Sequence, residues 1–150
     1  NEFGHPEWID FPRAGNGWSY KYARRQWSLC KPDYLRYKYL MNFDEDMIHL
    51  FRKENLLSFK PELIKADEQG KVLVFRRGSY IFAVDFNSTK SFEGYAFEAP
   101  EGEWELELDT DEKRYDGFSR LITREKHIAG TELRVYLPCR CALVFKKTNK

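Results

Sequence analysis

Hydrophobic residues in the first third of the chain recur at steps of three and four. The clearest series is Leu40, Phe43, Met47, Leu50 and Phe51. This spacing places the side chains on one face of an α-helix, which we expect to end near Asn55. A shorter helix is predicted from Ser19, whose hydroxyl can cap it, to Leu29. Pro32 separates the two helices, and Asp33 can cap the second one.

From Glu62 onward the hydrophobic period changes to two. β-branched and aromatic runs lie at residues 72–75, 80–86, 133–137 and 142–145. Residues 76–79, Arg-Arg-Gly-Ser, form a hairpin-type connection between the first two runs. Trp104, Leu106 and Leu108 alternate with glutamates, which is typical of a strand with one buried and one wet face. Short strands separated by turn residues predict an antiparallel sandwich or barrel, which about 90 residues can form alone.

The change of period near residues 54–61 predicts two domains, residues 1–56 and residues 57–150. The first domain contains a loop and two predicted helices, which cannot close a hydrophobic core by themselves. We therefore expect its apolar side chains to contact a sheet or barrel outside this chain, or to form a dimer. The side chains concerned are Phe3, Trp8, Trp18, Trp27, Phe43 and Phe51.

Composition narrows the choice of partners. The 25 basic and 24 acidic residues leave a formal net charge of +1, which argues against nucleic acid and against an anionic membrane surface. No apolar stretch approaches the length of a membrane span. Three cysteines do not make a disulfide framework, so a reduced, intracellular setting is expected. Cys139 and Cys141 would share one face of a strand, where we expect neither a bridge between them nor a zinc site.

Two segments invite a ligand-binding interpretation, and neither fits it well. Residues 15–17, Gly-Asn-Gly, lack the spacing and the Lys-Ser/Thr pair of a nucleotide loop, so a simple turn is predicted. Asp109 and Asp111 resemble the start of a calcium loop, but Lys113 occupies the third ligand position. We expect this acidic cluster to be a solvated loop. The three histidines lie in separate elements, and neither a metal ion nor a cofactor is predicted.

The opening residues, 1–19, are dense in aromatic, charged and turn-forming types. Ordering such a loop costs conformational entropy, so a larger structure normally holds it over a binding site. We therefore expect the chain to be cut from a longer protein. Aromatic rings stack on sugar rings, and Glu2, Glu7 and Asp10 are carboxylates in an aromatic setting that suits sugar binding or acid–base work. Hydrogen bonding to the loop backbone is the favoured role for these three.

This opening sequence resembles that of a known family. Residues 1–8 read Asn-Glu-Phe-Gly-His-Pro-Glu-Trp, and residues 10–13 read Asp-Phe-Pro-Arg. Further matching segments lie at residues 15–20, 22–27, 35–40, 42–44, 88–91 and 108–111, with Gly117, Arg120 and Leu121. Together they resemble the 1,4-alpha-glucan (glycogen) branching enzymes of the alpha-amylase superfamily over essentially the whole chain. Cys30 and its neighbours depart from the family pattern, in a loop without functional consequence.

The resemblance implies a mixed fold. Residues 1–56 correspond to the loop after the eighth strand and the terminal helices of a catalytic (β/α)8 barrel, and residues 57–150 to a C-terminal all-β antiparallel sandwich. The loop would border the substrate groove, because barrel active sites lie at the C-terminal ends of the strands. The substrate-binding side chains expected there are Glu7, Trp8, Asp10, Arg13 and Trp18.

The reaction that the resemblance implies is a retaining transglycosylation in glycogen synthesis. One carboxylate attacks an alpha-1,4 glucan, a second protonates the leaving oxygen, and a 6-hydroxyl of another chain is the acceptor. In the family these carboxylates come from earlier barrel strands. No catalytic residue is therefore predicted here, and the chain alone is expected to be inactive. Its expected partners are alpha-glucan and the rest of the barrel, in the cytoplasm.

Two other functions stay open. The β-domain could be a glucan-binding module, with Trp104 and the aromatic residues of the later strands as the motivation. The phase of Trp104 within its strand nevertheless favours burial. The β-domain could also be purely structural, bracing the barrel and mediating assembly.

Overall fold

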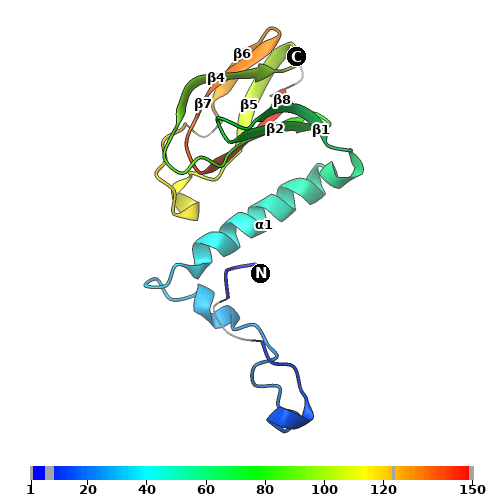
Figure 1. Cartoon of the computed structure of the whole chain (residues 1–150), viewed down its shortest axis with the longest axis vertical. Helices are drawn as coiled ribbons and strands as arrows, with labels where there is room; N and C mark the ends of the chain where they lie inside the picture. Colours follow the sequence, from blue (N-terminus) through cyan, green and yellow to red (C-terminus); the bar gives the residue numbers. More distant parts are fainter. Residues whose placement is uncertain (1, 6–8, 123, 149–150) are drawn as a thin grey trace. The chain divides into compact units, whose positions relative to one another are not determined.

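The computed structural model describes residues 2–5, 9–122 and 124–148 (Figure 1). The chain forms two units, Asn1–His49 and Leu50–Lys150. The first contains 3-10 helices, turns and most of the helix α1 (Tyr37–Lys53), and the second contains all the described strands. No helix within the described ranges is long and apolar enough to cross a membrane.

The periodic helix predicted in the first third is confirmed as α1 (Tyr37–Lys53). It begins at Tyr37, four residues after Asp33, so the predicted cap by Asp33 is wrong. The Asp33 carboxylate instead accepts a hydrogen bond from the Nζ of Lys38 at 2.7 Å. A 3-10 helix, η3 (Leu56–Ser58), follows α1. Asn55, between the two, has a left-handed φ of 49°, which ends the regular helix.

The helix predicted between Ser19 and Leu29 is wrong. Helical backbone is limited there to two 3-10 segments, η1 (Ala14–Asn16) and η2 (Trp27–Cys30), with turns between them. The Oγ of Ser19 accepts the backbone N–H of Lys21 at 3.2 Å instead of capping a helix. Such a bond offers the backbone a local alternative to helix. A stretch this short does not overcome the cost of helix nucleation.

Phe3 is buried within the first unit, contrary to the expectation that it needs a partner outside the chain. Its ring centroid lies 5.0 Å from that of Trp27 and 6.3 Å from that of Tyr37. The ring of His5 lies 5.5 Å from Phe3, and its Nε2 accepts the backbone N–H of Gln26 at 3.2 Å. These contacts give the first unit a small aromatic core of its own.

Among the described residues, eight strands form the second unit. They are β1 (Glu62–Asp67), β2 (Val72–Arg77), β3 (Tyr80–Asp85), β4 (Phe92–Glu98), β5 (Gly102–Asp109), β6 (Lys126–Ala129), β7 (Glu132–Leu137) and β8 (Cys141–Thr148). Six of them form a sheet in the order β1-β2-β3-β8-β5-β6, and β4 pairs with β7 in a second sheet. Every described pairing is antiparallel, so the predicted antiparallel sandwich is confirmed.

β1, β4 and β6 have no counterpart among the strands predicted from hydrophobic period. A register shift between Leu63 and Lys65 interrupts β1. A register shift between Phe92 and Tyr95 interrupts β4, and Gly94 in that interval has a φ of +63°. The shift breaks the alternation that identifies a strand in the sequence. β6 has only four residues, Lys-His-Ile-Ala, which is too short to show alternation.

The predicted hairpin between the first two runs is confirmed, with β2 and β3 joined through Gly78-Ser79. Gly78 has a φ of +56°, and a Cβ at this position would lie 3.2 Å from the ring of Phe59. Both constraints favour glycine over any larger residue.

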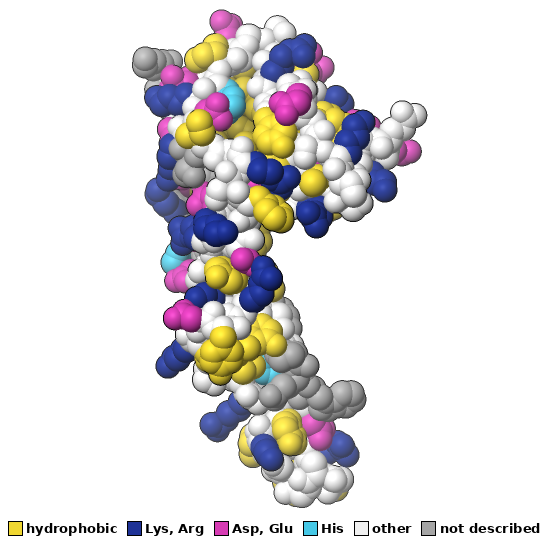
Figure 2. Space-filling view, turned by 90° about the vertical axis from the view of Figure 1, so that its left-hand side faces the viewer, with side chains coloured by type: hydrophobic (Ala, Val, Ile, Leu, Met, Phe, Trp, Pro, Cys, Tyr) yellow, Lys and Arg dark blue, Asp and Glu magenta, His cyan; other side chains and the backbone are white. Residues whose placement is uncertain are grey.

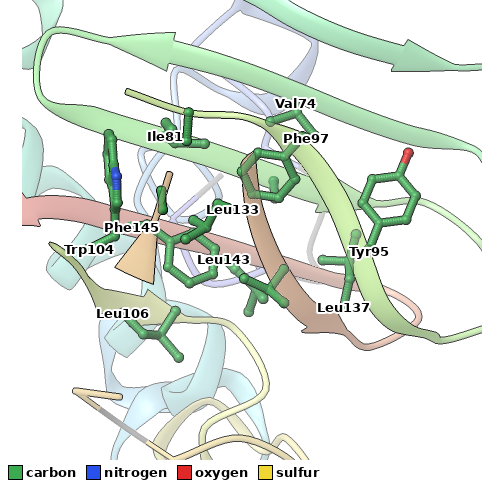
Figure 3. Close-up of a cluster of buried hydrophobic side chains, with 14 of the residues drawn as sticks. Val74, Ile81, Tyr95, Phe97, Trp104, Leu106, Leu133, Leu137, Leu143 and Phe145 are labelled. Carbon is green, nitrogen blue, oxygen red and sulfur yellow. The ribbon is translucent and has the colours of Figure 1, made fainter. Parts of the chain in front are cut away.

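The hydrophobic core lies between the two sheets (Figure 3). The rings of Phe97 on β4 and Phe145 on β8 lie 6.5 Å apart across it. Trp104 on β5 has no exposed surface, and its Nε1 donates to the backbone oxygen of Pro100 at 3.0 Å. The burial predicted for Trp104 is thus confirmed.

A register shift in β5 changes the position of Leu108. Leu106 pairs with Phe145 and belongs to the core between the sheets, whereas Leu108 pairs with the adjacent Val144. One extra residue in β5 therefore turns Leu108 to the opposite face of the large sheet. The single buried face predicted for this strand is wrong at Leu108, although both leucines are buried.

The outer face of the large sheet has its own cover within the second unit. Phe82 pairs with Val144 on this face, and the ring of Phe51 lies 5.7 Å from that of Phe82. Nearby, the Nζ of Lys146 donates to Glu54 Oε1 at 3.1 Å. Phe51 therefore has a partner inside this chain, contrary to the expectation that it needs one outside.

Candidate functional site

Five substrate-binding side chains are expected from the sequence: Glu7, Trp8, Asp10, Arg13 and Trp18. Glu7 and Trp8 lie outside the described residues. The other three lie within residues 9–22, which we call the aromatic loop. The structure brings Asp10 and Arg13 into direct contact and leaves Trp18 exposed.

A hydrogen-bond network around Asp10 orders the aromatic loop. Its Oδ1 accepts Arg13 Nε at 2.9 Å, and its Oδ2 accepts Arg13 Nη2 at 3.2 Å and Asn16 Nδ2 at 3.0 Å. The backbone N–H of Asp10 also donates to the oxygen of Tyr22 at 3.1 Å. The bonds from Arg13, and then from Asn16, hold the pKa of Asp10 below its usual value. Asp10 is therefore a poor proton donor and a good anchor.

The simple turn predicted at residues 15–17 is confirmed. Gly17, directly after η1, has a φ of 63°, and Trp18 follows with a φ of 58°. The backbone N–H of Trp18 donates to the oxygen of Arg13 at 3.0 Å. Two successive left-handed residues reverse the chain. The ring of Trp18 is left 67% exposed.

Trp18 shares the aromatic loop with other exposed rings. Phe11 is 71% exposed, and Tyr20 and Tyr22 are exposed as well. Exposed aromatic faces of this kind can stack on sugar rings. Sequence reasoning did not select Phe11 and Tyr20, because a single aromatic residue is more often part of a core. It treated Asn16 only as part of a turn. The available signal was the density of aromatic and turn residues in one segment.

The acidic segment after β5 is not the solvated loop that the sequence predicts. Asp109 and Asp111 are both buried. Arg120 donates to Asp111 through Nε and Nη2, both at 2.9 Å, and the backbone N–H groups of Phe118 and Arg120 donate to it at 3.1 and 2.9 Å. Burial raises the pKa of Asp111, but these bonds outweigh it and leave the pKa below its usual value. The cluster is a structural ion pair that anchors this loop.

Asp109 behaves in the opposite way, which gives stability a pH dependence. Burial raises its pKa to about 6, above the value of about 3.9 in an unfolded chain. Protonation therefore favours the folded state. The resulting stabilisation is fully present below about pH 4 and is lost as the pH rises to about 6.

The Asp109→Asn variant isolates this effect. Its neutral side chain keeps an oxygen that can accept the backbone N–H of Asp111, as Asp109 Oδ1 does at 2.8 Å. We expect the variant to be about 2 kcal/mol more stable than the original chain at pH 7, and no more stable at about pH 4. Urea denaturation at the two pH values measures the difference. A gain of equal size at both would show that ionisation of Asp109 is not its cause.

Among its described residues, the second unit offers neither a metal-ligand cluster nor an aromatic side chain around the larger of its described clefts. Among residues 2–5, 9–122 and 124–148, no group of three or more His, Cys, Asp or Glu side chains could hold a metal ion. A cleft of about 810 Å³, lined by Glu62, Arg76 and Glu132 among others, has no aromatic side chain among its described lining residues. Over the face shown in Figure 2, Lys and Arg side chains are interspersed with Asp and Glu, so neither sign of charge dominates it.

Comparison with known proteins gives matches over most of the chain. Residues 64–148 match the family model of the alpha amylase C-terminal all-beta domain. The chain is 42% identical over 135 residues to the chloroplastic/amyloplastic 1,4-alpha-glucan-branching enzyme of Oryza sativa subsp. japonica, covering 88% of this chain and 16% of that protein. It is 40% identical over 154 residues to the 1,4-alpha-glucan-branching enzyme of Rhizophagus irregularis, covering 96% and 22% respectively.

A third relative extends over nearly the whole chain. The 1,4-alpha-glucan-branching enzyme of Equus caballus is 39% identical over 159 residues, covering 99% of this chain and 23% of that protein. The chain thus spans about a fifth of the length of the curated relatives that it matches. Among solved structures, the alpha-amylase from H. orenii superposes with a TM-score of 0.49 at 17% identity, covering 73% of this chain and 20% of that one.

Proposed function

Since this chain belongs to the family of alpha-amylase C-terminal all-beta domains, we propose that it is the C-terminal part of a 1,4-alpha-glucan branching enzyme. The whole protein would cleave an alpha-1,4 glucan and transfer the segment to a 6-hydroxyl, forming an alpha-1,6 branch. The support is about 40% identity to proteins of that name over most of the chain. In this proposal the aromatic loop borders the glucan groove.

The main support for glucan binding by the aromatic loop is that its backbone is held by internal hydrogen bonds while its aromatic rings are exposed. The network of Asp10, Arg13 and Asn16 fixes the backbone, so the cost of ordering the loop is met before any ligand arrives. Phe11 and Trp18 remain exposed on this ordered segment. Glucan presents the apolar faces of sugar rings, which such aromatic side chains bind.

We further propose that residues 1–56 are the last loop and terminal helices of a (β/α)8 barrel. The matched family begins only at residue 64, whereas the branching enzymes match the preceding residues too. A loop after a barrel strand lies at the catalytic face. The nucleophile and the acid–base residue of the retaining reaction would come from other strands of the barrel. Asp10 is already held by Arg13, so its role is to position the loop.

The cysteines bear on the compartment in which the protein works. All three cysteines are free, which fits a reducing compartment. We propose the cytoplasm, while noting that the relative from Oryza sativa carries a name that places it in plastids.

A chimera tests the proposed function. The chain is joined to the part of the Oryza sativa relative that precedes the matching segment, and branching of amylose is followed by iodine absorbance and by the release of short chains on debranching. We expect branching by the chimera and none by this chain alone. Activity of this chain alone, or a folded but inactive chimera beside an active Oryza sativa protein, would overturn the proposal.

Within the chimera, the Trp18→Ala variant is expected to lower kcat/KM for amylose about tenfold, which corresponds to about 1.4 kcal/mol of lost stacking. Phe86→Ala is the matched control, because Phe86 is an equally exposed ring (65%) in the second unit. This control also separates the alternative function. If the sandwich itself binds glucan, Phe86→Ala lowers kcat/KM and Trp18→Ala does not. Trp104, the original motivation for that alternative, is buried and cannot stack on a sugar.

A further inference from the structure

Two thiols of the second unit share one guanidinium group. Arg120 Nη1 lies 3.6 Å from Cys139 Sγ, and Arg120 Nη2 lies 3.3 Å from Cys141 Sγ. Nη2 also donates to the backbone oxygen of Cys139 at 3.2 Å. Asp111 fixes the guanidinium from its other side. Both sulfur atoms therefore contact the same guanidinium group, whose position Asp111 fixes.

The backbone between the two cysteines is not extended. Cys139 lies before β8, Cys141 begins it, and Arg140 between them has a left-handed φ of 58°. Residues two apart on a strand have Cα atoms about 6.6 Å apart, near the upper limit for a disulfide. Cys139 and Arg140 lie in a turn rather than on a strand, and Cys141 Sγ donates to the Cys139 oxygen at 3.4 Å. The strand geometry that disfavours a bridge in the sequence analysis is therefore absent.

The two thiols differ in reactivity. Hydrogen bonds from Arg120, and then from Ser91, lower the pKa of Cys139. Burial raises the pKa of Cys141 to about 12. A thiolate is the reactive form toward peroxides, so Cys139 is the sulfur that reacts first. Cys141 stays protonated beside it, so it must lose its proton to the leaving oxygen before it can attack the Cys139 sulfur.

We propose that Cys139 and Cys141 form a peroxide-responsive dithiol site. The Cys139 thiolate attacks a hydroperoxide, the O–O bond breaks, and the sulfur becomes a sulfenic acid while one peroxide oxygen leaves as water or alcohol. The sulfur of Cys141 then loses its proton and attacks the Cys139 sulfur. An S–S bond forms, the S–O bond breaks, and water leaves. In sum, two thiols lose two electrons and two protons, and the peroxide accepts both.

This site is independent of the glucan-binding role of the aromatic loop. Cys30 supplies an internal comparison, because it is as buried as Cys139, with 7% of each residue exposed, but burial raises its pKa whereas hydrogen bonds lower that of Cys139. A general sensitivity to oxidants would consume all three thiols. A specific site would consume Cys139 and Cys141 together and spare Cys30.

The full chain is treated with hydrogen peroxide, and the products are mapped by mass spectrometry after proteolysis. We expect a Cys139–Cys141 disulfide that dithiothreitol reverses, with Cys30 still a thiol. In Cys141→Ser, Cys139 is expected to stop at the sulfenic acid, which dimedone captures. In Cys139→Ser, oxidation of Cys141 is expected to be at least about tenfold slower. Cys30→Ser is the matched control and should leave the rate unchanged.

Two results would overturn the proposal: loss of both thiols without a disulfide between them, or oxidation of Cys141 in Cys139→Ser at the original rate. Activation by the surrounding groups is tested through the pH dependence of the reaction. Arg120→Lys should move the midpoint of the oxidation rate to higher pH. Since that variant also weakens the pair with Asp111, Ser91→Ala is made in parallel. An unchanged midpoint in the folded variants would show that these groups do not activate Cys139.

Discussion

Replacing Asp111 with alanine is expected to destabilise the sandwich by about 3–5 kcal/mol, a large fraction of the stability of a small domain. The variant removes an acceptor that takes two bonds from the Arg120 side chain and two from backbone N–H groups. All of these donors are then left beside a buried space without their acceptor, which costs more than the bonds contribute while intact. In urea denaturation followed by far-UV circular dichroism, we expect the midpoint to fall by about 2 M.

The control for this prediction is Glu68→Ala. Glu68 is an exposed carboxylate between β1 and β2, so its removal should change the free energy of unfolding by less than about 0.5 kcal/mol. If Asp111→Ala also costs less than about 1 kcal/mol, the ion pair with Arg120 does not anchor the loop, and the account given for it is wrong.

Replacing Trp104 with alanine is expected to cost about 3–5 kcal/mol through a different mechanism. Trp104 has no exposed surface, so its removal opens a cavity between two sheets that cannot collapse without disturbing their pairing. The backbone oxygen of Pro100 also loses the donor that lies 3.0 Å away. Far-UV circular dichroism is the appropriate probe, because the substitution removes a fluorophore.

Trp18→Ala is the matched control, because it makes the same substitution at an exposed tryptophan. The same atoms are deleted, but from an exposed ring. We expect a change of less than about 0.5 kcal/mol in the free energy of unfolding. Similar costs for the two tryptophan variants would mean that burial does not determine the contribution of Trp104.

Long, regular patterns were predictable from the sequence. The hydrophobic spacing that predicts α1 covers several turns, and the phase of Trp104 within its strand is correct. Both succeed because the period of the backbone acts on every residue of the element. Short or interrupted elements gave no such signal. The register shift before Leu108 turns that side chain to the other face, which no alternation in the sequence reveals.

The remaining errors come from interactions between distant or competing groups. Asp109 and Asp111 look solvated because acidic residues usually are, but Arg120 follows nine residues later and allows Asp111 to be buried. Ser19 looks like a helix cap, yet its hydroxyl bonds to the next turn. In both cases a local preference is overridden or redirected by a partner that the sequence pattern does not identify.

The candidate site was likewise predictable in part: its residue types were, and the separate roles of its residues were not. The residue types of the aromatic loop point to sugar binding, and Asp10, Arg13 and Trp18 were selected on that basis. Their different roles were not predictable, since a carboxylate held by Arg13 and Asn16 anchors the loop whereas Trp18 is free to contact a ligand. Exposure separates the two roles, and exposure is a property of the folded chain.

The bonds that order the aromatic loop lie close together in the sequence. Arg13 and Asn16 hold Asp10, and Asn16 also bonds the backbone of Phe11 and Arg13. The conformation of this loop therefore depends on few residues outside it. We expect a segment ordered in this way to keep its shape when insertions or deletions occur elsewhere in the protein. Substitutions of its exposed aromatic side chains can therefore change which ligand it prefers, while Asp10, Arg13 and Asn16 keep the backbone conformation.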